Sequence, residues 1–255
     1  MDWATREHYD APVRSSPIVC IVCAALAVAC DKEPAPSQAP EAAAPAATPT
    51  ASAAPEPPRA PDIVVDPGNV AIGNDRVATG ELGLADKIGV FLNGRPMIAG
   101  QTVSVVAMRN SKPSQVAAVV TALKKAKAAA AVIHTDGRDG ATGKLPLEFA
   151  TTAADCAAVA WIGKDASIVV WPAGGGPSKK ILRGLAGPDM TLGTDAVRKQ
   201  QSSCNASELF VGADDALTWG LVFDLATMSF AAPGSHVSTG VLVNNPNIGR
   251  KLVLE

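Results

Sequence analysis

The chain has 255 residues, with 22 Lys and Arg against 24 Asp and Glu, a formal net charge of -2 and a pI near 5.9. That balance argues against a nucleic-acid partner, which calls for a basic patch or stripe. Aromatic residues make up 4% of the chain, so a core must be built from Val, Leu, Ile and Ala.

An apolar run, PIVCIVCAALAVAC, occupies Pro17 to Cys30. It is too short for a membrane-spanning helix but typical of the apolar core of a secretory signal. Its last residues, Leu26 to Cys30, resemble the bacterial lipoprotein box, in which small residues precede a lipidated cysteine. We therefore predict a signal peptide over 1–29 and lipid on Cys30, which would attach the protein to the membrane of a bacterial envelope, facing the periplasm. The alternative is an ordinary apolar core helix.

The next segment, 30–61, is rich in Pro and Ala and contains almost no large apolar side chains. Such a segment cannot bury enough apolar surface to offset the entropy of folding. We predict a disordered, semi-extended linker whose role is reach.

The folded part begins near Asp62, and its first half is predicted over 62–149. Asp66 to Asn69 (DPGN) is a strong turn signal between two short apolar runs, which predicts a hairpin. Further strands are expected at Gly89–Leu92, Gln101–Met108 and Ala130–His134. Between the last two, Ser111 supplies a hydroxyl cap for a helix with an apolar face made by Val116, Val119, Val120 and Leu123.

The second half, 150–255, follows a similar plan. Ala157–Ile162 and Ile168–Trp171 flank a short polar turn and predict another hairpin. A short helix is expected at Thr194–Gln201, capped by Thr194, and a second one carries apolar residues at helical spacing from Leu217 to Met228. The remaining expected strands are Leu209–Ala213, Gly240–Val243 and Lys251–Leu254.

The two halves can be aligned without gaps in their middles. Placing Val103–Ala107 on Leu209–Ala213 brings Val116 onto Val222 and Val119 onto Leu225. The sequence therefore predicts an α+β protein of two small mixed-sheet units, each a β-hairpin with helices packed on one face. The competing interpretation is a single mixed sheet in which similar elements recur by chance.

The segment Leu209 to Leu225, LFVGADDALTWGLVFDL, resembles the periplasmic domain of the ExbD/TolR biopolymer-transport family. In that family a strand ends in Ala-Asp, an aromatic residue follows, and a hydrophobic helix carries an Asp. Asp214, Trp219 and Asp224 occupy the last three of these places and become candidates for interaction. The resemblance implies a fold that self-associates and contacts envelope proteins. Family members couple protons through an acidic transmembrane helix, a role that we do not carry over to this chain.

No catalytic or metal-binding pattern emerges. His134 and His236 do not have metal-ligand spacing with each other or with the cysteines. The glycine-rich run Gly137–Lys144 departs from a phosphate-binding loop at Arg138 and Leu145. We therefore expect a non-enzymatic protein without cofactor or metal.

Two alternatives remain open. The first is a periplasmic small-ligand-binding lipoprotein with a pocket lined by Trp161, Trp171 and Trp219; the second is a hydrolase with a dispersed site. Cys156 and Cys204, the cysteines outside the signal and the lipidation site, are expected to form a disulfide, with two separate buried thiols as the alternative.

Overall fold

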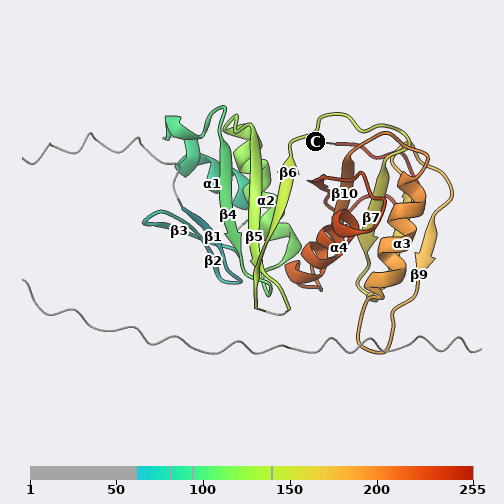
Figure 1. Cartoon of the computed structure of the whole chain (residues 1–255). Coiled ribbons are helices and arrows are strands. Elements are labelled where there is room, and N and C mark those ends of the chain that lie inside the picture. The colour runs from blue at the N-terminus through green and yellow to red at the C-terminus, as the bar shows by residue number, and fades with distance from the viewer. Residues whose placement is uncertain (1–61, 81, 94, 139, 255) are drawn as a thin grey trace, which may run out of the picture. The chain divides into compact units, whose positions relative to one another are not determined.

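The structure is a computed structural model that describes residues 62–254 except 81, 94 and 139. The predicted signal peptide 1–29, the lipidation residue Cys30 and the linker up to 61 lie outside the described residues. The described part has an α/β fold, with one eleven-stranded mixed sheet and four α-helices (Figure 1).

The first half of the described part contains five strands and two α-helices. In chain order they are β1 (Ile63–Val65), β2 (Asn69–Ile72), β3 (Asp75–Ala78), α1 (Leu84–Asn93), β4 (Thr102–Ala107), α2 (Pro113–Lys125) and β5 (Ala130–Asp136), with a 3-10 turn at Pro96–Ile98 before β4. The predicted turn closes the β1–β2 hairpin because the Asp66 carboxylate accepts hydrogen bonds from the backbone N–H groups of Gly68 and Asn69.

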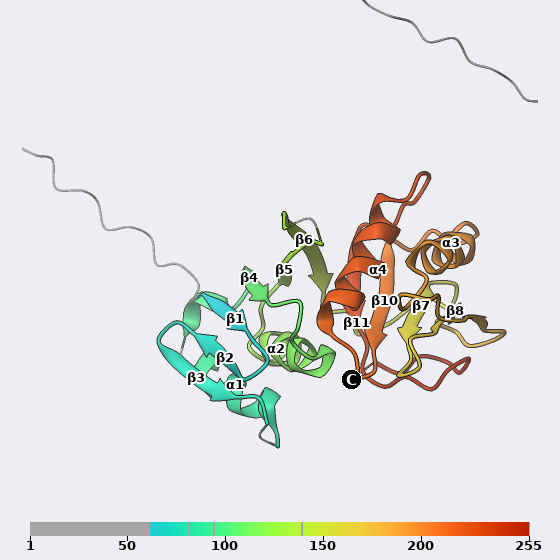
Figure 2. The same cartoon turned by 90° about the horizontal axis from the view of Figure 1, so that it is seen from below.

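The second half has the same composition of elements. They are β7 (Ala158–Ile162), β8 (Ile168–Pro172), β9 (Lys179–Ile181), α3 (Met190–Gln201), β10 (Glu208–Ala213), α4 (Trp219–Ala231) and β11 (Thr239–Leu242). One further strand, β6 (Thr142–Glu148), connects the halves. Figure 2 shows that α1 lies beside α2 in the first half and that α3 lies beside α4 in the second.

The two halves repeat one topology. The strand order is β3-β2-β1-β4-β5 in the first half and β9-β8-β7-β10-β11 in the second. The pairings also correspond. In each half the first three strands are antiparallel neighbours; the fourth strand pairs in parallel with the first, and the fifth pairs in parallel with the fourth. With Val103–Ala107 laid on Leu209–Ala213, α2 and α4 coincide from end to end, each with 13 residues. The predicted repeat of the element order is confirmed.

The prediction of two separate sheets in an α+β fold is corrected by β6. This strand pairs antiparallel with β5 and parallel with β11, where Gly240 lies opposite Leu147. The repeats therefore share a single sheet, in which helices connect parallel strands, and the class is α/β. The alternation along β6, with Leu145 and Leu147 buried between more exposed neighbours, is that of a strand with one face in the core.

Four local predictions were wrong. Ser111 does not cap α2: the N-cap residue is Lys112, and the Ser111 hydroxyl donates to the Val65 carbonyl instead. Gly89–Leu92 lies in α1, not in a strand, because Ile88 and Leu92 bury a helical face one turn apart. Helix α3 begins earlier than expected and is capped by Asp189, whose carboxylate accepts the Leu192 N–H; Thr194 lies inside the helix. The segment Lys251–Leu254 does not form a strand but covers the sheet.

The core has one large layer and one small one. Side chains from both repeats and from all four helices form a single cluster on the helix-facing side of the sheet. A second cluster lies on the other side, and its strand residues all come from the second repeat, among them Trp161, Trp171 and Phe210. The corresponding side of the first repeat carries no such cluster among the described residues.

Candidate functional site

The side of the first repeat that faces away from the helices is exposed. Val64 lies opposite Val106, which lies opposite His134 on β5, and all three alternate with buried core residues. Val106 and Met108 are each 47% exposed. We call this surface the open face; it comprises Val64, Ala71, Val106, Met108, Val132 and Pro146, bordered by Arg76, His134 and Lys144.

The equivalent side of the second repeat is covered. By the strand registers, Trp161 corresponds to Val64, Phe210 to Ser104 and Val243 to His134, and each is at most 8% exposed. The cover is made by the chain before β7, by the turn after α3 and by the C-terminal segment. Its apolar members include Ala150, Ala153, Cys204, Leu252 and Leu254. The two repeats therefore share a topology but differ in whether the same sheet face is occupied.

The C-terminal segment of the cover is held by hydrogen bonds to its main chain. The N–H of Leu252 donates to the carbonyl of Ala173 at 2.7 Å, and the indole Nε1 of Trp171 donates to the carbonyl of Arg250 at 3.2 Å. A Cβ at Gly212 would collide with the Val243 carbonyl oxygen and lie 2.8 Å from the Trp161 ring. Gly212 corresponds to the exposed Val106, so the covered repeat has a glycine where the open repeat has a side chain.

The predicted bridge between Cys156 and Cys204 is present, with their Cα atoms 5.5 Å apart. Cys204 is 3% exposed and packs in the second cluster, whereas Cys156 is exposed. The disulfide therefore fastens two pieces of the cover, the chain before β7 and the turn after α3, to each other.

The three candidates from the family resemblance lie in or beside the interior. Trp219 is fully buried, and its Nε1 donates to Thr135 Oγ1 at 2.9 Å, while that hydroxyl donates to the Ala107 carbonyl. Asp214 is half-buried, and its carboxylate accepts the Ala216 N–H in the turn before α4. Trp219 thus contributes a contact within the chain, from α4 to β5, and presents no surface to a partner.

Asp224 is the centre of a partly buried ion cluster between the repeats. Arg109 donates to both carboxylate oxygens, at 2.9 and 2.7 Å, and Arg138 donates its Nε–H to one of them at 2.8 Å. The hydrogen bond to Asp224 raises the pKa of Arg109 above its usual value, so the guanidinium remains charged. Arg109 also donates to the carbonyls of Asp136 and Gly220. Asp224 is therefore occupied by contacts within the chain.

The three tryptophans do not line one pocket. Trp219 packs in the helix-side cluster, and Trp161 and Trp171 pack in the cluster on the other side of the sheet. A hollow of about 300 Å³ lies elsewhere, at the carboxyl ends of β6 and β11. Its wall combines apolar and polar residues, among them Thr121, Glu148, Phe149, Asn244, Asn247 and Leu252.

Within residues 62–254, apart from 81, 94 and 139, no group of three or more His, Cys, Asp and Glu side chains could hold a metal ion. No helix of that range is long and apolar enough to cross a membrane.

Comparisons with known proteins add no relative. Protein-family models, curated proteins and solved structures each gave no match to this chain.

The sequence contained a signal for the open face that our reading of motifs missed. In the strand run Gln101–Met108, the buried positions are Val103, Val105 and Ala107, so Val106 and Met108 must point to the opposite side. A strand that is apolar on both faces is expected to be buried on both. The exposure of Val106 and Met108 is therefore the departure that marks this surface.

Proposed function

We propose that the protein is a non-enzymatic, lipid-anchored module of the bacterial envelope, facing the periplasm, that binds a partner protein on its open face. The observation that carries this proposal is the difference between the repeats: one sheet face is covered by the chain itself, and its topological equivalent is exposed. An exposed apolar patch on a strand-built surface is typical of a protein interaction site.

The open face is bordered by charges of both signs, since Asp136 and Glu148 lie on the same side of β5 and β6 as His134 and Lys144, but the row through Val106 carries only cations and favours acidic residues in the partner there. Along one cross-strand row, Arg76 lies at one end and Lys144 at the other, with Val64 and Val106 between them. A second copy stacked on this row would bring cations over cations in either orientation, which opposes face-to-face pairing. A partner segment with apolar residues between acidic ones fits the row.

The resemblance to the ExbD/TolR family supports the envelope role. The family's Ala-Asp strand end and Asp-bearing helix fall on β10 and α4, and the same strand, helix and strand recur in the first repeat. Lipid at Cys30 would hold the module at the membrane in place of the family's proton-coupled helix, and the segment up to 61 would give it reach. The self-association that the resemblance implies would then use a surface other than the open face.

Site-specific photo-crosslinking tests the open face. A photoreactive phenylalanine analogue replaces Val106 in the full chain, in the cells that make the protein, and Val90 on α1 serves as the control. Val90 lies on a helix and is a valine like Val106. Its side chain is 72% exposed, which is more than the 47% of Val106. We expect a discrete adduct with one acidic protein from position 106 and none from position 90.

Charge reversal makes the test sharper. Lys144→Glu should reduce the adduct at position 106 severalfold, because it removes one of the bordering cations. An adduct only with a second copy, equal adducts from positions 106 and 90, or no adduct at position 106 would each contradict the proposed partner.

Small-ligand binding is the second candidate, and the hollow of about 300 Å³ favours it. The hollow lies outside the carboxyl ends of two parallel strands, which is where open α/β sheets bind ligands. Its volume is at the lower end of the range for ligand pockets. Thr121→Trp would fill it from α2, and we expect this variant to abolish any stabilisation that a screen of amino acids and sugars detects by thermal shift. Unchanged stabilisation would exclude the hollow.

A further inference from the structure

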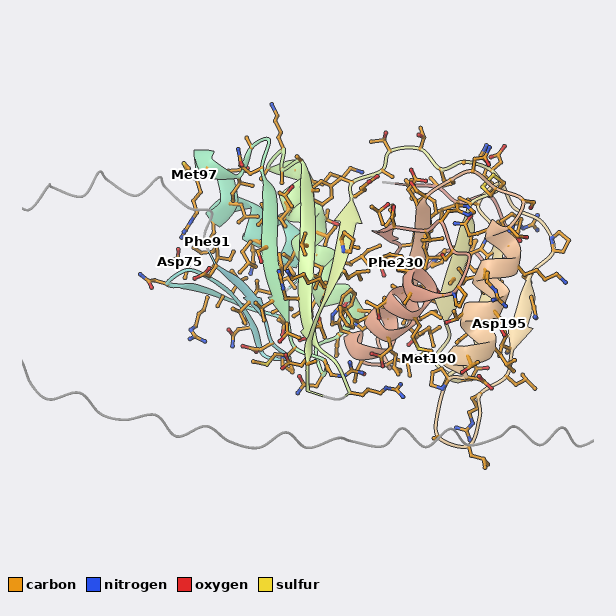
Figure 3. All side chains as sticks on the ribbon, in the orientation of Figure 1. Asp75, Phe91, Met97, Met190, Asp195 and Phe230 are labelled. Atoms are coloured by element: carbon orange, nitrogen blue, oxygen red, sulfur yellow. A yellow bond between two sulfur atoms is a disulfide. The ribbon has the colours of Figure 1, made fainter. Side chains whose placement is uncertain are left out.

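A second surface lies at the far edge of the sheet, where the chain leaves β9. We call residues Leu182–Gly187 the leucine tip. Leu182 is 73% exposed and Leu185 is fully exposed at 111%, so both side chains project beyond the folded surface. The tip is a tight reversal, because Gly184 and Gly187 form an isolated antiparallel bridge. In Figure 1 this loop extends away from the sheet below the first turn of α3, which Figure 3 marks with the label Met190.

The leucine tip is bordered by cations. Lys179 and Lys180 lie on β9, which is the edge strand, and Arg183 stands between the two leucines. Among the described residues, Lys180 pairs with Asp165 at 3.0 Å, and no ion pair is found for Lys179 or Arg183. The nearest acid that follows, Asp189, uses its carboxylate to cap α3. The unpaired charge at the tip is therefore positive.

Two projecting leucines beside cations fit a lipid surface better than a protein groove. A flat partner would leave the end of Leu185 without contacts on several sides, whereas acyl chains surround a side chain that enters them. Leucine side chains enter the boundary between headgroups and acyl chains, and neighbouring Lys and Arg bind anionic headgroups. The following helix presents another apolar side chain in its first turn, since Leu192 is 50% exposed.

We propose that the leucine tip inserts into an anionic lipid surface, with Lys179 and Arg183 contacting the headgroups. This contact orients the folded part on a membrane and does not depend on the lipid at Cys30 or on the partner of the open face. Each cation near an anionic surface should strengthen binding about fivefold. Burial of each leucine should contribute about tenfold or more.

An environment-sensitive fluorophore at the tip tests the insertion. NBD is attached to Leu185→Cys in a full chain whose Cys20, Cys23 and Cys30 are serine, while Cys156 and Cys204 remain in their disulfide. The matched control carries the label at Leu82→Cys. Leu82 is 97% exposed, and the charged residues nearest to it in sequence are the acids Glu81 and Asp86, with Lys87 one position further on.

With vesicles of phosphatidylcholine and phosphatidylglycerol, we expect a blue shift and a severalfold rise in emission from position 185, and little change from position 82. The rise should shrink in high salt and with vesicles of phosphatidylcholine alone. Replacing both Lys179 and Arg183 with Gln should weaken the response about twentyfold, and Leu182→Ser should weaken it about tenfold.

Several results would overturn the proposal. One is an equal response from positions 82 and 185, because any membrane contact would then come from another part of the chain. Another is an equal response to neutral and anionic vesicles. A response to polyglutamate without a response to vesicles would assign the tip to an acidic protein.

Discussion

Arg109 donates two parallel hydrogen bonds to Asp224, which lies 115 residues further along the chain. Arg109 follows β4 of the first repeat, and Asp224 lies within α4 of the second. The Asp224 side chain is only 11% exposed, so the pair is largely shielded from water. Together with the single β6–β11 residue pair, it fixes the two repeats against each other.

Removing one member of this pair should destabilise the protein strongly. Asp224→Asn leaves the Arg109 guanidinium partly buried with weaker acceptors, and we expect a loss of about 3 kcal/mol in the free energy of unfolding. Urea denaturation followed by circular dichroism measures it. Arg138→Met is the control, because the Arg138 side chain is 65% exposed and its ion pair should contribute less than about 1 kcal/mol. Equal losses in the two variants would contradict the assigned difference in burial.

The hydrogen bond between Trp219 and Thr135 predicts a second loss across the repeats. Thr135→Val keeps the shape of the side chain but leaves the buried indole N–H without its acceptor and the Ala107 carbonyl without the hydroxyl donor. We expect a cost of about 1 to 3 kcal/mol. Thr121→Val on the exposed side of α2 is the matched control and should change the free energy of unfolding by less than about 0.5 kcal/mol. The prediction fails if the two Thr→Val variants are equally stable.

The sequence predicted those elements whose apolar period was unambiguous. Helix α2, both hairpins and the correspondence of Val116 with Val222 were confirmed, because a buried face imposes a spacing that can be read from single residues. The short run Gly89–Leu92 was misassigned because four apolar residues satisfy a strand and a helix equally. Strand β6 was missed because its glycine, lysine and proline obscure the alternation.

The contacts that join the repeats could not have been predicted. Asp224 was singled out by the family resemblance, but nothing near it in sequence identifies Arg109 or Arg138 as its partners. The same holds for the open face: the alternation of β4 shows that Val106 points away from the core, but whether another segment covers it depends on where distant chain ends lie. The disulfide was predicted by elimination, since Cys156 and Cys204 were the cysteines left after the signal and the lipidation site.

Removal of the disulfide should destabilise the second repeat. The bridge closes a loop with a sequence separation of 48, which corresponds to about 4 kcal/mol in the chain-entropy relation. We expect the Cys156→Ser, Cys204→Ser double variant to lose about that amount in chemical denaturation. Adding a reductant to the unaltered protein should lower its denaturation midpoint to that of the double variant. If neither the variant nor the reduced protein differed in midpoint from the oxidised protein, the bridge would not stabilise the fold.

Backbone strain at the end of α2 predicts a stabilising substitution. Lys127 has a φ of 60°, and its N–H and that of Ala128 bond back to Lys124 and Leu123, so it occupies the left-handed position that usually holds glycine. Lys127→Gly should raise the free energy of unfolding by about 1 kcal/mol. Lys125→Gly, inside the last helical turn, should lower it by a similar amount. Changes of the same sign in the two variants would contradict this assignment.

Gly212→Ala tests the seating of the cover directly. Its new Cβ would collide with the Val243 carbonyl oxygen and press on Trp161, so either β10 must shift or the chain after β11 must lift from the sheet. We expect a loss of at least about 2 kcal/mol. Amide hydrogen exchange should accelerate at Leu252, whose N–H bonds to Ala173.

The control for that substitution is Gly89→Ala in α1. A Cβ there meets nothing within 4 Å, and the helix should gain up to about 1 kcal/mol from the better propensity of alanine. If Gly212→Ala instead left both stability and exchange unchanged, the C-terminal segment would not rest on the sheet. The second repeat would then present a face as accessible as the open face, and the difference between the repeats would no longer mark the partner site.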